Sequence, residues 1–323
     1  MTVAGSALAT SRHVVRRDGE ANFAVPQAFK GKSEGFRRWA LVGEDTPAVH
    51  TGFAMCTLEA RGWVAAHVHS YEESVYILEG EAELTTREGV FKLRVGDYAL
   101  IPVGVPHSWR ASPSAGARWA QMMAPQPRSR FGGDTFFVND PPQEREAQVI
   151  DVRDPRTRSF GHIEPSNMDV SRQTQDQLAV SASMRTALLV YSGITVKMML
   201  DSELGAQHST MFMVQYERDG KAGAHDHPFE ETYLILDGSV DATFDGQRYH
   251  MTTGEVAFAG VGCVHSFSNP ANQPVRWLET QAPQPPARYS YRFARDWDYL
   301  RSRIPLGDSQ IPSPLVGKGQ GGG

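Results

Sequence analysis

Two stretches of the chain decide its fold: residues 67–86 read HVHSYEESVYILEGEAELTT, and residues 225–244 read HDHPFEETYLILDGSVDATF. The second follows the first at an offset of 158 residues. The same offset pairs residues 50–127 with residues 208–285 without a gap. Two copies are too few for a solenoid, so the sequence predicts one domain that is present twice.

Both copies have the composition of short β-strands. Runs such as YALIP (residues 98–102) and VAFAG (residues 256–260) follow Gly-Asp and Gly-Glu turns, which is typical of hairpin connections. Evenly spaced short strands in a unit of about 100 residues indicate a jelly-roll barrel. We therefore expect an all-β fold of two tandem jelly-roll barrels (double-stranded β-helices) with few, short helices.

The length of the chain agrees with two domains. At roughly 100–200 residues per domain, 323 residues make two. We expect an N-terminal domain at residues 1–150 with its core at about 40–130. A C-terminal domain is expected at residues 151–310 with its core at about 195–290, and a flexible tail at residues 311–323.

Composition excludes several classes of partner. The formal net charge of -5 gives no electrostatic reason to bind nucleic acid or an anionic membrane. No apolar run approaches the roughly 18 residues of a membrane span. The first residues lack the order of a secretory signal, and only Cys56 and Cys263 could form a disulfide. A cytoplasmic protein is the simplest expectation.

Each copy carries the spacing His-x-His-x3-Glu and a second, distant His. Residues two apart on a strand share a face, a turn would bring in the Glu, and a later strand would supply the last His. Three imidazoles and one carboxylate that converge in a barrel indicate a metal site, with Fe or Mn favoured and Ni or Zn also suitable. The expected ligands are His67, His69, Glu73 and His107 in the first copy and His225, His227, Glu231 and His265 in the second.

Strand alternation from these ligands predicts what lines each pocket, although bulges can reverse it and core packing is the alternative for every residue. The C-terminal pocket is expected to be the more polar one and hence the catalytic one, because proton transfer needs ionisable groups. Its candidate catalytic residues are Tyr233 and Glu279, and its candidate substrate contacts are Gln215, Phe267 and Gln281. The N-terminal pocket is expected to be apolar, with Trp109 and Met55 as candidate substrate contacts beside Val75 and Ile77.

The same residues resemble the two motifs of the cupin superfamily, and specifically those of two-domain cupins. Motif one matches at Gly62, His67, His69, Glu73 and Gly80, and again at Gly220, His225, His227, Glu231 and Gly238. Motif two matches at Gly96, Pro102, Gly104 and His107, and again at Gly254, Gly262, His265 and Asn269. The departures are a first gap one residue short, Ala111 in place of Asn, and Gly260 in place of Pro.

This resemblance implies a metal-dependent enzyme with a small-molecule substrate. The two full ligand sets look more like those of oxalate decarboxylases, germins and quercetin dioxygenases than like the ureidoglycine aminohydrolase-like group. The first expectation is a non-haem dioxygenase-type oxidoreductase that acts on a small organic acid or phenolic compound, with O2 as a co-substrate. The alternatives are a non-redox hydrolase, decarboxylase or isomerase, and a non-catalytic metabolite-binding bicupin. Open sheet edges favour a homodimer.

Overall fold

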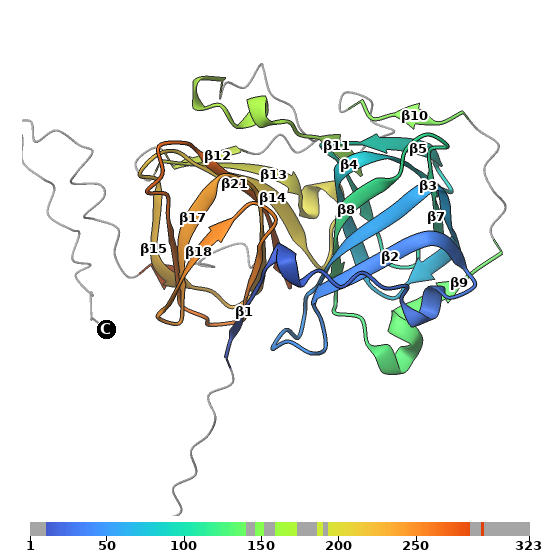
Figure 1. Cartoon of the computed structure of the whole chain (residues 1–323), viewed down its shortest axis with the longest axis horizontal. Helices are drawn as coiled ribbons and strands as arrows, with labels where there is room; N and C mark the ends of the chain where they lie inside the picture. Colours follow the sequence, from blue (N-terminus) through green and yellow to red (C-terminus); the bar gives the residue numbers. More distant parts are fainter. Residues whose placement is uncertain are drawn as a thin grey trace, which may run out of the picture.

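Figure 1 shows two β-barrels that lie side by side, with most strands of the first half of the chain in one and the strands of the second half in the other. The structure is a computed structural model and describes residues 11–139, 146–151, 159–172, 186–189, 193–284 and 292–293. The expected all-β fold of two jelly-roll barrels is confirmed. The proposed tail at residues 311–323 lies outside the described residues.

The N-terminal barrel is built around two long, bent strands, β3 and β4, which take part in both of its faces. Both strands pair with β7 and with β8, so the two faces form one continuous sheet. Its strands are β2 (Ser33–Val42), β3 (Gly52–His69), β4 (Glu72–Thr86), β5 (Gly89–Arg94), β6 (Asp97–Ile101), β7 (His107–Ala111), β8 (Ala117–Ala124), β9 (Thr135–Phe137), β10 (Gln148–Val149) and β11 (Phe160–His162).

The C-terminal barrel divides into two sheets. Within the described residues, their strand orders are β1-β19-β16-β21-β14-β13-β12 and β18-β17-β20-β15-β22. The strands are β1 (His13–Arg16), β12 (Thr186–Leu189), β13 (Ile194–Leu200), β14 (Thr210–Tyr216), β15 (Lys221–Asp226), β16 (Glu230–Asp237), β17 (Ser239–Phe244), β18 (Gln247–Thr252), β19 (Val256–Ala259), β20 (His265–Ser268), β21 (Val275–Ala282) and β22 (Arg292–Phe293).

Helices contribute little to the described chain. They are the 3-10 turns η1 (Asp18–Glu20), η2 (Gln27–Phe29), η3 (Ser129–Asp134), η5 (Pro165–Met168), η6 (Val170–Arg172) and η8 (Ser202–Leu204). In the part of the chain that the structure describes, none of the helices could cross a membrane.

Three apolar clusters hold the molecule together. One fills the N-terminal barrel around Trp109 and Trp119, and one fills the C-terminal barrel around Phe267 and Trp277. The third lies between the barrels and joins Trp39 and Tyr98 of the first half to residues such as Phe258 of the second. The barrels are therefore fixed to each other by a buried apolar interface, which is the largest favourable contribution to such an arrangement.

Two glycines of the repeated motif allow a strand to bend where no other residue fits. Gly80 has φ +68 and Gly238 has φ +79, which is the left-handed region that disfavours side chains. A Cβ atom at Gly80 would lie 1.9 Å from the carbonyl oxygen of Gly116, and one at Gly238 would lie 2.7 Å from that of Pro274. The shared glycine therefore reflects a close backbone approach.

Each barrel also receives a strand from the other half of the chain. The N-terminal strand β1 pairs antiparallel with β19 of the C-terminal barrel, with His13 opposite Ala259. Figure 1 shows this blue strand against the orange barrel. In the other direction, β11 pairs with β6 of the N-terminal barrel. The domain boundary at residue 150 stays a prediction. Strand β1 precedes this boundary but pairs within the C-terminal barrel, and β11 follows it but pairs within the N-terminal barrel.

A pair of buried carboxylates connects the barrels reciprocally. Glu230 accepts hydrogen bonds from the backbone N–H groups of Val49, His50 and Thr51 at 2.7, 2.9 and 2.9 Å. Its counterpart Glu72 accepts them from residues 207, 208 and 209 at 2.6, 3.3 and 3.0 Å. Each loop lies at the offset of 158 from the other, so the contact obeys a pseudo-two-fold.

Candidate metal centres

The N-terminal centre forms where β3, β4 and β7 meet inside the barrel. His67 and His69 are at the end of β3, Glu73 is the second residue of β4, and His107 begins β7. The pairing of β3 with β7 sets His67 directly opposite His107. The metal-binding atoms of the three imidazoles lie within 4.8 Å of one another, and all four side chains are buried. The structure thus brings the predicted ligands together.

Each imidazole in this centre is oriented through its Nδ1 atom. Those of His67 and His107 lie 2.7 and 3.0 Å from the carbonyl oxygens of Ala65 and Val105. That of His69 lies 3.0 Å from Thr135 Oγ1. Metal-binding histidines are typically held in this way by the nitrogen that does not touch the metal. The Nε2 atoms are consequently directed into the centre.

The carboxylate of Glu73 has one oxygen tied down and one directed at the imidazoles. Gln121 Nε2 donates to Glu73 Oε1 at 2.7 Å. Glu73 Oε2 lies 3.0 Å from His69 Nε2 and 3.4 Å from His107 Nε2. Within the described residues, Glu73 Oε2 and His107 Nε2 are fully enclosed and have no hydrogen-bond partner apart from the facing ligand atoms. Buried polar atoms without partners are costly, so this atom set fits a divalent metal ion.

The C-terminal centre repeats this arrangement. His225 is in β15 and pairs with His265 at the start of β20, while His227 follows β15 and Glu231 lies in β16. Their imidazole Nδ1 atoms lie 2.7–2.9 Å from the carbonyl oxygens of residues 223, 229 and 263. Glu231 Oε2 lies 2.7 Å from His227 Nε2 and 3.4 Å from His265 Nε2.

Electrostatics favours the protonation states that a metal requires. Burial lowers the pKa of His69 and of His225 to about 4 and holds the pKa of His67 well below its ordinary value. Burial alone would raise the pKa of Glu73, but the facing imidazoles of His107 and His69 hold it well below its usual range. These imidazoles are therefore neutral and the carboxylate charged at neutral pH, which are the forms that bind metals.

His227 and Glu231 behave as an ion pair. Burial would lower the pKa of His227, but the Glu231 carboxylate raises it above the ordinary value. Burial would likewise raise the pKa of Glu231, yet His227 and His265 hold it well below the usual range. A metal ion would replace the proton of His227 as the positive partner of Glu231.

The environment of Glu231 contains three further polar side chains. Gln281 Nε2 donates to Glu231 Oε1 at 2.5 Å. The hydroxyl of Tyr233 donates to Glu231 Oε2 and lies 3.0 Å from His265 Nε2. Glu279 accepts a hydrogen bond from Trp277 Nε1 at 2.9 Å, and burial together with the charge of Glu231 raises its pKa well above the ordinary value. Tyr233, Glu279 and Gln281 are thus inside the barrel, where alternation predicted them.

The inward placement expected for Met55 and Gln215 is wrong. Met55 belongs to the apolar cluster between the barrels. Gln215 Nε2 donates to Glu217 at 2.9 Å and to the backbone of Met168 at 3.4 Å, outside the C-terminal barrel. The reason is a register shift before each ligand pair, between residues 64 and 67 and between residues 222 and 225. Such a bulge reverses the alternation.

The two aromatic residues that follow the last ligand are inside their barrels. Phe267 packs against Tyr233 at 4.8 Å and against His265 at 5.9 Å between ring centroids. Trp109 stacks on Trp119 at 5.0 Å in the interior of the N-terminal barrel. Their roles as substrate contacts stay predictions.

The N-terminal pocket contains a cation that the sequence did not reveal. Arg38 of β2 lies opposite Cys56 and has its guanidinium over the rings of Phe29 and Phe36, at 5.1 and 5.8 Å. Its charge acts on Tyr71, Cys56 and Glu73, and its Nε atom is enclosed without a hydrogen-bond partner among the described residues. Hence the expectation of an apolar N-terminal pocket is wrong.

A second polar residue in the same pocket also escaped prediction. The ring of Tyr71 is fully buried and stacks on that of His69 at 4.1 Å, with its hydroxyl 3.3 Å from His69 Nε2. Burial raises the pKa of the Tyr71 hydroxyl above its ordinary value and that of the Cys56 thiol to about 12. Arg38 lies outside the ungapped repeat and Tyr71 lies between two predicted ligands, so the repeated motifs did not point to either residue. Knowledge of the register shift in β3 would have been needed to predict that both side chains lie in this pocket.

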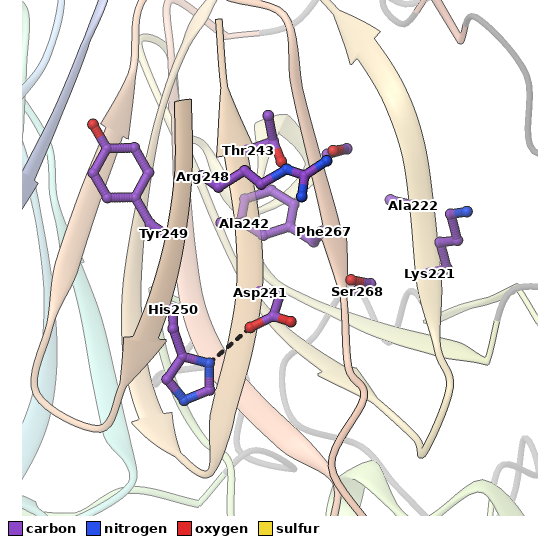
Figure 2. Close-up of a pocket in the computed structure, with 11 residues that line it drawn as sticks. Lys221, Ala222, Asp241, Ala242, Thr243, Arg248, Tyr249, His250, Phe267 and Ser268 are labelled. Carbon is purple, nitrogen blue, oxygen red and sulfur yellow. Dashed lines mark hydrogen bonds and ion pairs between the residues drawn. The ribbon is translucent and has the colours of Figure 1, made fainter. Parts of the chain in front are cut away.

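A separate pocket lies on the outside of the C-terminal barrel. Figure 2 shows its polar lining on β17, β18, β20 and β15, with the His250–Asp241 ion pair at 2.7 Å. Its volume is about 450 Å³. None of the residues that line it is a predicted metal ligand, so it is distinct from the metal centres.

Comparison with known proteins identifies both halves. Residues 54–123 and 212–280 each match the cupin domain family. Among curated proteins no significant sequence match was found. The chain therefore contains two cupin domains, as the repeated motifs indicated.

Solved structures of oxalate decarboxylases share the fold. The formate complex of the Lactobacillus farciminis enzyme is 16% identical, with 88% of this chain and 89% of that chain covered and a TM-score of 0.60. The Bacillus subtilis enzyme at pH 4.6 is 15% identical, with 91% and 83% covered and a TM-score of 0.58. A further structure of that enzyme, from a study of its Mn(II) centres, is 15% identical with 91% and 84% covered and a TM-score of 0.59.

Proposed function

We propose that this two-domain cupin is a metal-dependent enzyme for a small organic acid or phenolic compound, with a non-haem dioxygenase-type reaction as the first candidate. The single observation that carries the proposal is the pair of centres, in each of which three buried imidazoles and one buried carboxylate converge. Fe or Mn is the favoured ion and Ni or Zn is acceptable to the same ligands. A bound ion of this kind polarises substrate oxygens and, if redox-active, supports reaction with O2.

Arg38 favours an organic acid as the substrate of the N-terminal centre. A buried guanidinium with an unpaired Nε atom beside the Glu73 carboxylate can bind the carboxylate of a ligand through charge-assisted hydrogen bonds. Val196 occupies the corresponding position in the C-terminal barrel, because it lies opposite Val214 as Arg38 lies opposite Cys56, so this position carries no cation there. We therefore propose that the substrate binds in the N-terminal barrel rather than in the C-terminal one.

Non-redox chemistry is the second candidate, and the C-terminal centre favours it. Glu279 is buried next to Glu231 and Tyr233 reaches the same carboxylate. A hydrolase, decarboxylase or isomerase needs a group within reach of the substrate to move a proton, and Tyr233 and Glu279 are placed to do so. A cytoplasmic location and a homodimer remain part of the proposal.

Two experiments separate these functions. Oxygen uptake during turnover of small acids and phenols by metal-loaded protein supports the dioxygenase-type reaction, whereas turnover without uptake supports non-redox chemistry. Activity that survives complete chelation contradicts both candidates.

The variants His69→Ala and His227→Ala then locate the reaction. We expect the first to abolish turnover and the second to leave a substantial fraction. The reverse result moves catalysis to the C-terminal centre.

A further inference from the structure

The hydroxyl of Tyr233 lies among the ligand atoms of the C-terminal centre. It donates to Glu231 Oε2, the same oxygen that faces His227 Nε2 at 2.7 Å, and it lies 3.0 Å from His265 Nε2. The ring is 1% exposed and is packed against Phe267, which limits its movement. The phenol oxygen therefore touches metal-binding atoms from two different strands, β16 and β20.

The N-terminal centre provides an internal comparison. Val75 stands at the position of Tyr233, opposite Gln121, as Tyr233 stands opposite Glu279. In that centre the carboxylate oxygen and the last imidazole nitrogen have no hydrogen-bond partner within the described residues apart from the facing ligand atoms. In the C-terminal centre the corresponding two atoms both meet Tyr233. Tyr233 thus contacts the carboxylate and the last imidazole of its centre, which Val75 cannot do, whereas Tyr71 of the N-terminal centre contacts His69.

The contact of this oxygen with His265 has the spacing of two ligands of one ion. Metal–oxygen and metal–nitrogen bonds are about 2.0–2.2 Å long, so neighbouring ligand atoms around one ion are roughly 3 Å apart. The contact of Tyr233 with His265 has this length. A phenol oxygen is a hard donor, of the kind that suits iron and manganese.

We propose that Tyr233 is a fifth protein ligand of the C-terminal metal ion, so that the two centres of this chain are chemically different. The N-terminal ion would keep four protein ligands and more open positions for substrate. On metal binding the phenol proton leaves to solvent and no electron is transferred. The inference depends on the metal centre alone, and it leaves Glu279 as the group that moves a proton in the non-redox candidate.

An optical test can separate a ligand from a mere hydrogen-bonding neighbour. Iron(III) bound by a phenol oxygen absorbs visible light through charge transfer, which a hydrogen-bonded phenol does not cause. The protein is loaded with Fe(II), oxidised to Fe(III), and measured in two backgrounds that each retain one centre. His67→Ala retains the C-terminal centre and His225→Ala retains the N-terminal one. Iron content is determined for each sample.

We expect a visible band in His67→Ala, with tyrosine vibrations enhanced in its resonance Raman spectrum, and no band in His225→Ala. The second background also tests Tyr71, whose hydroxyl approaches only His69. Tyr233→Phe in the His67→Ala background should lose the band.

Tyr216→Phe is the matched control and should keep the band, because Tyr216 is in the same barrel with its ring packed against that of Trp277, at 4.6 Å between ring centroids. An iron-loaded His67→Ala protein without the band, or a band that survives Tyr233→Phe, overturns the proposal. A His67→Ala protein that folds but takes up no iron overturns it as well.

Discussion

At the scale of single residues, the metal ligands are expensive to bury without an ion. A buried imidazole or carboxylate loses its hydration, and this loss must be offset by hydrogen bonds or a metal. The Nδ1 atoms of the six histidines are held by backbone carbonyls or by Thr135. The Nε2 atoms of these histidines and one carboxylate oxygen of each Glu face one another. A bound metal ion would therefore offset the cost of burying these residues better than the protein does without an ion.

Metal content is the first prediction at this scale. His67→Ala and His225→Ala should each remove about one metal equivalent per chain, measured by elemental analysis after loading with Mn, Fe, Ni or Zn, since each deletes one of three clustered imidazoles. His250→Ala is the control, because its imidazole is exposed and pairs with Asp241 on the outer surface. A substitution that leaves the content unchanged would show that its centre does not bind the ion.

Substrate affinity is the second prediction. Arg38→Met should raise KM for an acidic substrate roughly tenfold to a hundredfold, which corresponds to the loss of one hydrogen bond to a charged group. KM for a neutral analogue should change little. Arg37→Met is the control, because Arg37 is on the same strand with an exposed side chain. Equal effects of Arg38→Met on both substrates would assign it a structural role.

At the scale of elements, the reciprocal Glu72 and Glu230 contacts hold one loop of each barrel against the other. Glu230→Gln should lower the free energy of unfolding by about 1.5–3 kcal/mol, since it removes the charge from a carboxylate that accepts three backbone hydrogen bonds. Denaturant unfolding of Glu230→Gln and of the exposed control Glu59→Gln measures the effect. Equal stability of the two variants would mean that the contact contributes nothing.

The attachment of β1 should depend on pH. Burial lowers the pKa of His13 below its ordinary value of 6.5, so the folded state prefers the neutral ring. The contribution of the neutral His13 ring to the free energy of unfolding is complete above pH 6.5. It is lost as the pH falls from 6.5 toward the lower pKa that His13 has in the folded state. The titratable and charged groups that face or flank His13 are Tyr249, Asp245, Cys263 and Arg12.

Hydrogen exchange of the amides of residues 13–16 measures this dependence. It should accelerate between pH 7 and 5 relative to amides in the core of β16, and His13→Phe should remove most of the difference. Burial raises the pKa of Asp245, but the hydrogen bond and charge of Arg12 bring this pKa below its ordinary value. The contribution of Asp245 to stability therefore stays constant over this pH range. Unchanged protection of β1 at pH 5 would contradict the role of His13.

The alternation of side chains along a strand predicted correctly for some residues, and wrongly for others, whether the side chain lies inside the barrel. It placed Tyr233 and Phe267 inside because no register shift separates either residue from a ligand on its own strand, and it placed Glu279 and Gln281 inside because they lie on β21 directly opposite Tyr233 and Glu231. It failed for Met55 and Gln215 because the backbone is displaced before the ligand pairs. A bulge depends on how two strands pair across the barrel, and that information is absent from a local pattern.

At the scale of the whole molecule, the ungapped repeat was sufficient to predict two barrels and the clustering of three imidazoles inside each. It could not predict which segments cross between the barrels. Strand β1 has no counterpart in the repeat, and β11 follows the first copy. Their pairing is decided by which sheet edge is left uncovered once both barrels are formed.

Removal of β1 is the prediction at this scale. A chain without residues 1–17 should lose several degrees of melting temperature compared with one without residues 1–10, because β19 then loses its outer neighbour. Differential scanning calorimetry on both deletions measures the difference. Equal melting temperatures would show that β19 does not need this strand.

The place of β1 has a consequence for synthesis on the ribosome. His13 leaves the ribosome 246 residues before its partner Ala259, which at 5–20 residues per second is a delay of roughly 12–50 s. During that time Val14 and Val15 are the start of an unpaired strand that other nascent chains could capture. Arg12, Arg16 and Arg17 surround this pair, and charges beside a short apolar segment oppose such association. In the folded protein these arginines form ion pairs with Asp245, Asp45 and Glu255. Before β19 is synthesised, the same arginines would oppose association of the unpaired strand with other chains.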